Sequence, residues 1–133
     1  MSQLGMTKTT ALDMDAAEGA IRESLANEGF GVLTEIDVAA TFKEKLDIDR
    51  SPYKILGACK PALANAALTH DEQIGLLLPC NVTLSQTDDG TIISIVDPFV
   101  MLSPVEESAE MNELATSAKA SLVAALDAVP ETA

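Results

Sequence analysis

The distribution of apolar and polar residues begins with the pattern of a strand followed by a helix. Residues 2–14 mix threonines with apolar side chains, which favours a first strand. Apolar residues then recur at helical spacing over 15–28. Asp15 and Glu18 have the form of a capping box at the start of this segment, and Gly29 suits the left-handed residue that often ends a helix. We therefore predict a strand and then a helix over 15–28.

The same alternation continues through the middle of the sequence. Residues 30–37 (FGVLTEID) and 53–59 (YKILGAC) are rich in β-forming side chains and predict the second and third strands. We expect Asp37 to cap a short helix after the second strand, because aspartate is a favoured N-cap residue. Pro61 suits the first position of a helix that continues to about residue 69. Each of these strands is therefore expected to lead directly into a helix.

The second half of the sequence has the pattern of a hairpin and a long C-terminal helix. Residues 74–86 predict a long strand, followed by the turn TDDG and a partner strand at 91–98. Pro79 has no N–H to donate, so we expect it at an edge or a bulge of the long strand. The sequence SPVE at 103–106 has the form of a helix start, and apolar residues at helical spacing follow it as far as Pro130.

These elements follow the order β-α-β-α-β-α-β-β-α, which predicts an α/β fold. We expect an α+β-like two-layer sandwich in which the helices pack on a single sheet. The hairpin makes at least part of the sheet antiparallel, so the whole sheet is either mixed or antiparallel. The 133 residues show no repeat and no linker, which predicts a single domain over 1–133 that buries about two-thirds of its unfolded surface.

Composition describes the core and points to a compartment. Hydrophobic residues make up 47% of the chain but aromatic residues only 3%, so the core must be aliphatic and rich in alanine. No apolar run approaches the roughly 20 residues that a membrane span needs, and the N-terminus lacks the pattern of a secretory signal. Two cysteines are too few for a disulfide scaffold. We therefore expect a cytoplasmic protein.

The net charge of −13 argues against a nucleic-acid partner and against an anionic membrane surface. The charge is uneven, because five of the eight basic residues and only three acidic residues lie within 43–60. This segment carries +2 and the rest of the chain −15. A positive segment leading into Cys59 suits an anionic ligand or a thiolate. The alternative is a solvated segment whose charges pair among themselves. The five basic residues are Lys43, Lys45, Arg50, Lys54 and Lys60.

Several sequence blocks, taken in order, are similar to those of a known family. They are GFGVLTEIDVAATFKEKL, PYKILGACKPALANAAL, IGLLLPCNV and the DP at 97–98. The chain resembles the domain-of-unknown-function 302 family of small bacterial and archaeal proteins over residues 15–102 and again in the C-terminal helix. The resemblance implies a compact α/β domain that forms a dimer, and it supplies no activity. Lys60 stands where the family usually has asparagine, and the matching positions are Glu35, Asp37, Tyr53, Cys59, Pro61, Pro79, Cys80 and Asn81.

Cys59 is the first candidate for chemistry. It ends a predicted strand and stands two residues before Pro61, so it lies near the start of the following helix. A helix N-terminus presents unpaired N–H groups and a partial positive charge, and together with Lys60 it favours the thiolate. The alternative is a small buried side chain that closes a tight strand-to-helix turn, because unreactive cysteine is among the most buried residue types.

Cys80 lies in an otherwise apolar segment, which is typical of a structural residue. If the strands that hold the two cysteines are neighbours, their thiols can approach each other, which leaves a redox pair open as an alternative, although the Cys-x-x-Cys spacing is absent. Cys59, Cys80 and His70 lack the spacing that pre-organises metal ligands. We therefore predict no metal and no cofactor.

Two polar residues of the predicted strands are further candidates. Glu35 and Asp37 are two residues apart on a strand, so both point to one face and form a candidate carboxylate pair. The simpler interpretation makes Asp37 a helix cap and Glu35 the partner of a nearby lysine. Tyr53 can offer its hydroxyl group to a ligand, or it can pack with its hydroxyl group in water.

The leading hypothesis is a small cytoplasmic homodimer that binds a small anionic or thiol-reactive ligand beside Cys59. Cys59 would contact or react with the ligand and Lys60 would supply positive charge. Tyr53, Cys80, Asn81 and Glu35 are the further ligand-binding candidates. The alternative is a non-enzymatic interaction or structural dimer with both cysteines in the core. A third hypothesis is a thiol-redox protein that uses Cys59 and Cys80, the two catalytic candidates, and whether the protein is an enzyme stays open.

Overall fold

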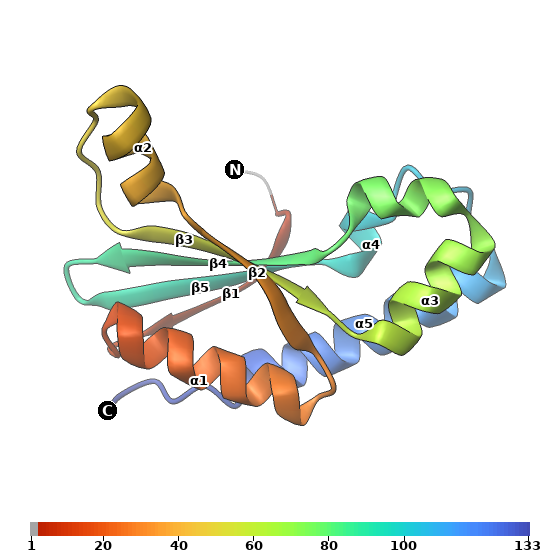
Figure 1. Cartoon of the computed structure of the whole chain (residues 1–133). Helices are drawn as coiled ribbons and strands as arrows, with labels where there is room; N and C mark the ends of the chain where they lie inside the picture. The colour runs from red at the N-terminus through yellow and green to blue at the C-terminus, as the bar shows by residue number, and fades with distance from the viewer. Residues whose placement is uncertain (1–2) are drawn as a thin grey trace.

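A computed structural model describes residues 3–133 and contains a five-stranded sheet. The strand order across the sheet is β1-β5-β4-β3-β2, and every neighbouring pair is antiparallel (Figure 1). The predicted α/β fold with helices on a single sheet is confirmed, and the sheet is antiparallel throughout. The strands are β1 (Gly5–Thr10), β2 (Gly31–Asp37), β3 (Tyr53–Cys59), β4 (Cys80–Thr87) and β5 (Gly90–Val96).

The helices occupy three places around the sheet. Helices α1 and α5 lie along one face, α3 and α4 lie beyond one end, and α2 stands away from the sheet at the other end (Figure 1). No helix within residues 3–133 is both long and apolar enough to cross a membrane. The helical segments are α1 (Met14–Asn27), α2 (Val38–Leu46), α3 (Pro61–His70), the 3₁₀ helix η1 (Glu72–Leu77), α4 (Pro98–Met101) and α5 (Ala109–Asp127).

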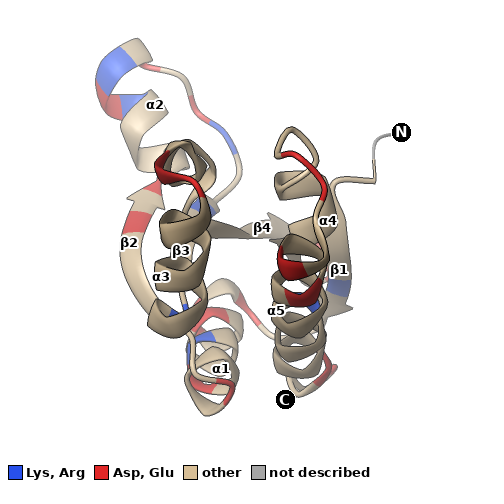
Figure 2. Ribbon diagram, turned by 90° about the vertical axis from the view of Figure 1, so that its right-hand side faces the viewer, with Lys and Arg blue, Asp and Glu red and all other residues tan. Residues whose placement is uncertain are grey.

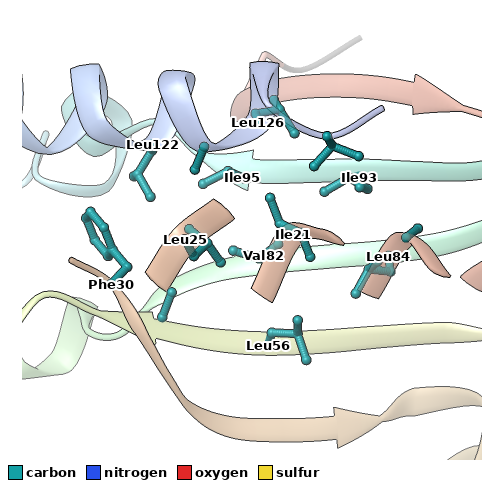
Figure 3. Packing of buried hydrophobic residues seen from close by; sticks show 14 of the residues in the cluster. Ile21, Leu25, Phe30, Leu56, Val82, Leu84, Ile93, Ile95, Leu122 and Leu126 are labelled. Atoms are coloured by element: carbon teal, nitrogen blue, oxygen red, sulfur yellow. The ribbon is translucent and has the colours of Figure 1, made fainter. Parts of the chain in front are cut away.

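The main core lies between the sheet and the pair α1 and α5. Successive strand residues point to opposite faces, so alternate residues of the three central strands enter this layer. Figure 3 shows the strand residues meeting those of the two helices. The result is an aliphatic core of the kind that the composition predicts. Its members include Ile21, Leu25, Leu56, Val82, Leu84, Ile93, Ile95, Leu122 and Leu126.

The opposite face of the sheet carries a broad hollow lined by both polar and apolar residues. An antiparallel sheet can expose one face to water while the other packs on the core. The hydroxyl oxygens of Thr7 and Ser94, on neighbouring strands, are 3.0 Å apart on this face. Tyr53, Asn81 and Thr83 line the same hollow.

The ends of α1 agree only in part with the prediction. The N-cap is Asp13 and not Asp15, because the Asp13 carboxylate accepts a hydrogen bond from the Ala16 N–H at 2.8 Å and the helix begins at Met14. Gly29 has φ of 84°, and it ends the helix as predicted, with the Phe30 N–H donating to the Leu25 carbonyl at 2.9 Å.

Two predicted strands extend several residues beyond those observed. The first strand spans only residues 5–10 of the predicted 2–14, and Ser2 lies outside the described residues. The prediction of strand over 74–79 is wrong, because this segment contains part of η1 and β4 begins at Cys80. Asp71 caps η1 by accepting a hydrogen bond from the Gln73 N–H, and Ile74 turns into a second buried cluster with Met111. Tertiary packing therefore overrides the apolar strand pattern.

The predicted helix start at 103–106 is also wrong. The short helix α4 ends before this segment. At its start, the Asp97 carboxylate accepts a hydrogen bond from the Phe99 N–H at 2.9 Å. The next segment turns, with Val105 packed against the second cluster. Helix α5 begins only at Ala109, where the Ser108 hydroxyl accepts a hydrogen bond from the Met111 N–H. Both serines have the form of a cap, and the packing of Val105 selects the later one.

Candidate functional site

The structure divides the predicted site residues among three places. Cys59, Lys60 and Cys80 line one cavity at the end of the sheet. Tyr53 and Asn81 line the hollow on the open face instead. Glu35 is bound in an ion-pair cluster beside α1. The predicted ligand site is therefore split, with three of its residues at the cavity and two at the hollow.

Strand geometry explains this separation. Tyr53 and Cys59 are the two ends of β3, and six steps along a strand span about 20 Å. Cys80 pairs directly with Ala58 and shares its helix-covered face. Asn81 follows Cys80 in the strand, so its side chain points to the other face.

The cavity lies where the ends of β3 and β4 meet α3, α4 and α5. Its volume is about 50 Å³. Apart from the two cysteines and Lys60, no lining residue has a side chain with an ordinary hydrogen-bonding group. The site is therefore an apolar space with its few reactive and charged groups close together. The other lining residues are Phe30, Ala58, Leu63, Ala64, Ala67, Leu78, Pro79, Pro98, Met101, Leu102, Leu114 and Ala118.

The two cysteines are both free thiols but differ in their burial. Cys80 is 7% exposed, whereas Cys59 is half-buried. Burial raises the pKa of the Cys80 thiol to about 11, with a smaller contribution in the same direction from the charge of Cys59. Cys80 is therefore a neutral thiol at pH 7. Cys59 is the more accessible of the two.

Lys60 brings positive charge to the cavity. It occupies the N-cap position of α3, and its ammonium group lies 5.8 Å from the centre of the Phe30 ring. Its side chain also passes Gly29, where the Cε atom would be 3.2 Å from a Cβ added to the glycine. Within residues 3–133, no carboxylate forms an ion pair with Lys60. This charge is therefore not neutralised by a direct partner.

Lys54 belongs instead to a structural cluster of charges. Its ammonium group binds Glu35 at 2.7 Å and Glu18 at 2.9 Å, while Arg22 binds Glu18 at 2.9 Å. Burial alone would raise the pKa of Glu18, but the hydrogen bonds from Lys54 and Arg22 hold this pKa below its ordinary value. Asp37 caps α2, since its carboxylate accepts a hydrogen bond from the Ala40 N–H at 2.9 Å. The simpler interpretation of both carboxylates is confirmed.

The remaining basic residues of 43–60 lie away from the cavity. Lys43 binds Asp47 at 2.9 Å and Asp49 at 3.2 Å. The guanidinium of Arg50 lies over the ring of Phe42, at 5.7 Å, and over the ring of Tyr53, at 5.5 Å. Internal pairing therefore holds for Lys43 and Lys54, and Lys60 is the member of this segment that reaches the site.

The histidine and the metal candidates give no further site. His70 ends α3, and its Nδ1 atom lies 3.6 Å from a carboxylate oxygen of Glu110. In the part of the chain that the structure describes, no three His, Cys, Asp or Glu side chains are arranged to hold a metal ion. That the protein uses no metal and no cofactor stays a prediction.

The sequence did not predict which residues form the side of the cavity opposite Cys59. That side comes from α4 and α5, whose Met101 and Leu114 lie far from Cys59 in the sequence. Lys119 fixes the two helices together by binding Asp97 at 2.8 Å. Burial would raise the pKa of Asp97, but the hydrogen bonds from Lys119 and from the Phe99 N–H lower it. The helical spacing of apolar residues predicted the helix that contains Leu114, but it did not indicate which cavity Leu114 lines.

Comparison with known proteins agrees with the resemblance seen in the sequence. A family model described as "Domain of unknown function DUF302" matches residues 6–129. The crystal structure of an uncharacterized conserved protein DUF302 from Bacillus stearothermophilus superposes with a TM-score of 0.87. Its sequence is 29% identical, and the match covers 96% of this chain and 99% of that one. No curated protein matches the chain. The comparisons thus identify a family and a fold without a ligand.

Proposed function

The chain belongs to the DUF302 family, and we propose that it is a small-molecule-binding domain whose site is the cavity beside Cys59. The observation that supports this proposal is the convergence of Cys59, Lys60 and Cys80 on one apolar pocket. Ligand sites in proteins are typically apolar hollows with a few placed polar groups. The open-face hollow, by contrast, is broad and carries no charged side chain.

The lining residues define what such a ligand contains. Its apolar part lies among the side chains of α3, α4 and α5, and its anionic or thiol-reactive group lies beside Lys60 and Cys59. Cys80 contributes a neutral thiol to the wall, because its raised pKa disfavours the thiolate. A redox pair is the less favoured use of these residues for the same reason. Free thiols also suit a reducing compartment, so we place the protein in the cytoplasm.

The first test is the rate at which iodoacetamide alkylates each cysteine of the native protein, resolved by mass spectrometry. Cys59 is expected to react readily at pH 8. Cys80 is expected to react about a hundredfold more slowly than an ordinary thiol, because raising a pKa from 9.0 to about 11 lowers the thiolate fraction by that factor. If Cys59 reacts only after the protein is unfolded, the proposed site is closed to ligands and the proposal is wrong.

A second measurement tests the role of Lys60. The ratio of the Cys59 alkylation rate with anionic iodoacetate to that with neutral iodoacetamide reports the local charge. The substitution Lys60→Met is expected to lower this ratio by roughly two- to fivefold, since it removes a cation near the thiol. Lys45→Met, which removes a cation from α2, is the matched control and is expected to leave the ratio unchanged. Equal effects of both substitutions would contradict a local role for Lys60.

A second candidate function is a dimeric interaction module. It is supported by residues 31–52, which contain β2 and α2 and which we call the arm. No residue of α2 is buried, and the arm exposes the large apolar side chains Leu33, Ile36, Leu46 and Ile48. Figure 2 shows basic residues on α2 and on the segment that follows it. The arm holds three basic and five acidic residues and carries a net charge of −2, so its exposed apolar side chains, and not its charge, support a contact with a second copy.

Sedimentation velocity tests this interface. The substitution Leu46→Glu is expected to shift the protein from dimer to monomer, because it places a carboxylate in a contact that would otherwise be apolar. Leu76→Glu is the matched control, since Leu76 is 80% exposed but lies on η1, outside the arm. A wild-type protein that sediments as a monomer at all concentrations would exclude the dimer.

A further inference from the structure

We infer that the ligand of the cavity carries a short aliphatic chain of roughly three to five carbons, with a thiol-reactive group at the end that faces Cys59. This inference rests on the proposed function and names the class of ligand for the same site. It follows from three properties of the cavity: its volume, the chemistry of its walls and the position of Cys59 and Lys60 among them.

The volume sets the length of the chain. The cavity has about 50 Å³, and a water-sized group occupies at least roughly 10–15 Å³. Roughly three to five groups of the size of a methylene therefore fill the space. Cavities that bind an aromatic ring are about 150 Å³, so a ring does not fit without movement of the helices.

The walls select an apolar chain. Helices α3 and α5 contact each other beside the cavity and contribute alanines and leucines to it. These side chains offer no hydrogen bond to a polar group, and a polar group buried without a partner is strongly unfavourable. Aliphatic carbons have no such requirement. The alanines are Ala64 and Ala67 on α3 and Ala118 on α5, and they leave the space that a larger side chain would fill.

The reactive end of the ligand is placed by β3 and α3. Cys59 is the last residue of β3, and Lys60 is the N-cap of α3, so both belong to the turn that borders the cavity. Cys80 is a weak competitor, because it is buried and remains protonated at neutral pH. A ligand whose chain enters the apolar space therefore presents its reactive atom to Cys59.

Alkyl methanethiosulfonates provide a direct test, because they combine a thiol-reactive sulfur with a chain of chosen length. The Cys59 thiolate attacks the divalent sulfur and forms an S–S bond. The methanesulfinate leaves with the electron pair of the broken S–S bond, and the thiol proton goes to solvent. Methyl, propyl, butyl, hexyl and benzyl reagents are compared on the wild-type protein, with labelling at Cys59 quantified by mass spectrometry. Each rate is divided by that of the same reagent with a small free thiol.

The normalised rate is expected to rise by up to about fourfold for each carbon added, to a maximum at propyl or butyl, since each buried methylene contributes about that factor. It is expected to fall for hexyl and benzyl, which exceed the cavity. The substitution Ala64→Leu fills the space and is expected to remove the preference for propyl and butyl over methyl. Ala62→Leu, an exposed position of the same helix outside the cavity, is expected to keep it.

The outcomes separate the two proposals. A maximum at propyl or butyl that Ala64→Leu abolishes supports the short-chain ligand. If Cys59 reacts with the methyl reagent but the normalised rate is flat, or rises continuously to hexyl, the chain-length inference is overturned while the site beside Cys59 stands. If no reagent modifies Cys59 in the folded protein, the proposed function itself is overturned.

Discussion

The two ends of β3 differ in how the rest of the chain covers them. At Cys59, residues of three helices line an apolar pocket at the end of the sheet. At Tyr53, the strand emerges from the arm, in which α2 has no buried residue and Leu46 is 60% exposed. Figure 1 shows α2 standing away from the sheet while α3 lies close to α5.

This difference indicates which kind of partner each end suits. A concave apolar pocket with a few polar groups suits a small molecule that fits its shape. Exposed apolar side chains on a projecting helix have no such limit and suit the surface of another protein. The same aliphatic residues therefore support a ligand at one end of β3 and a second copy of the chain at the other.

The sharpest test of this contrast compares two leucines by their contribution to the free energy of unfolding. Leu56, within β3, is fully buried, so Leu56→Ala is expected to lower this free energy by about 2–5 kcal/mol. Leu46→Ala is expected to lower it by less than about 0.5 kcal/mol, because the side chain is largely exposed within one copy. Both are measured by guanidinium unfolding.

Protein concentration makes this comparison informative about the arm. In a monomer, the effect of Leu46→Ala is independent of concentration. In a dimer that covers the arm, the effect grows with concentration, since association stabilises the folded state by mass action. A large effect of Leu46→Ala at every concentration would show that the arm packs within one copy, contrary to the structure.

The sequence predicted the elements whose signals are local. Gly29 ends α1, Pro61 opens α3 and Asp37 caps α2, because each of these residues acts on its own backbone neighbours. The failures lie where distant packing decides. Ile74 leaves the strand pattern to join a cluster with Met111, and Val105 joins the same cluster where a helix start was predicted.

The candidate site follows the same rule. Cys59 and Lys60 are adjacent in the sequence, and their position before a helix was readable from Pro61. The opposite side of the cavity required the fold of α4 and α5, more than 30 residues away, and no local signal indicates it. Asn81 was predicted to share a site with Cys80. The two residues are adjacent in β4, so their side chains point to opposite faces of the sheet.

A second test compares two lysines that each bind two carboxylates. Lys54 joins β3 to Glu18 of α1 and is only a quarter exposed, so Lys54→Met is expected to lower the free energy of unfolding by about 1–2 kcal/mol. Lys43 binds Asp47 and Asp49 within the arm, where all three side chains are exposed, so Lys43→Met is expected to cause no resolvable change. Equal losses would mean that the arm is coupled to the core.

The pH dependence of the Lys54→Met effect identifies its origin. The pKa of Glu18 is held below its ordinary value in the folded protein, so its contribution to stability is present above the unfolded pKa and is lost as the pH falls through the folded pKa. The difference between wild type and Lys54→Met is therefore expected to be constant from pH 8 to about pH 5 and to shrink below about pH 4. A difference that stays constant at pH 3 would indicate lost packing of the lysine side chain instead.

The smallest expected effect concerns two aspartates that cap helices in the same way. Asp13 accepts a hydrogen bond from Ala16 N–H at 2.8 Å, and Asp37 accepts one from Ala40 N–H at 2.9 Å. Because α1 buries residues in the main core, Asp13→Ala is expected to lower the global free energy of unfolding by about 1 kcal/mol. Asp37→Ala is expected to change it by less than about 0.5 kcal/mol and to speed amide hydrogen exchange within α2 alone, since a helix without buried residues unfolds locally. If Asp37→Ala instead lowers global stability as much as Asp13→Ala, α2 folds together with the core, and the contrast between the two ends of β3 is lost.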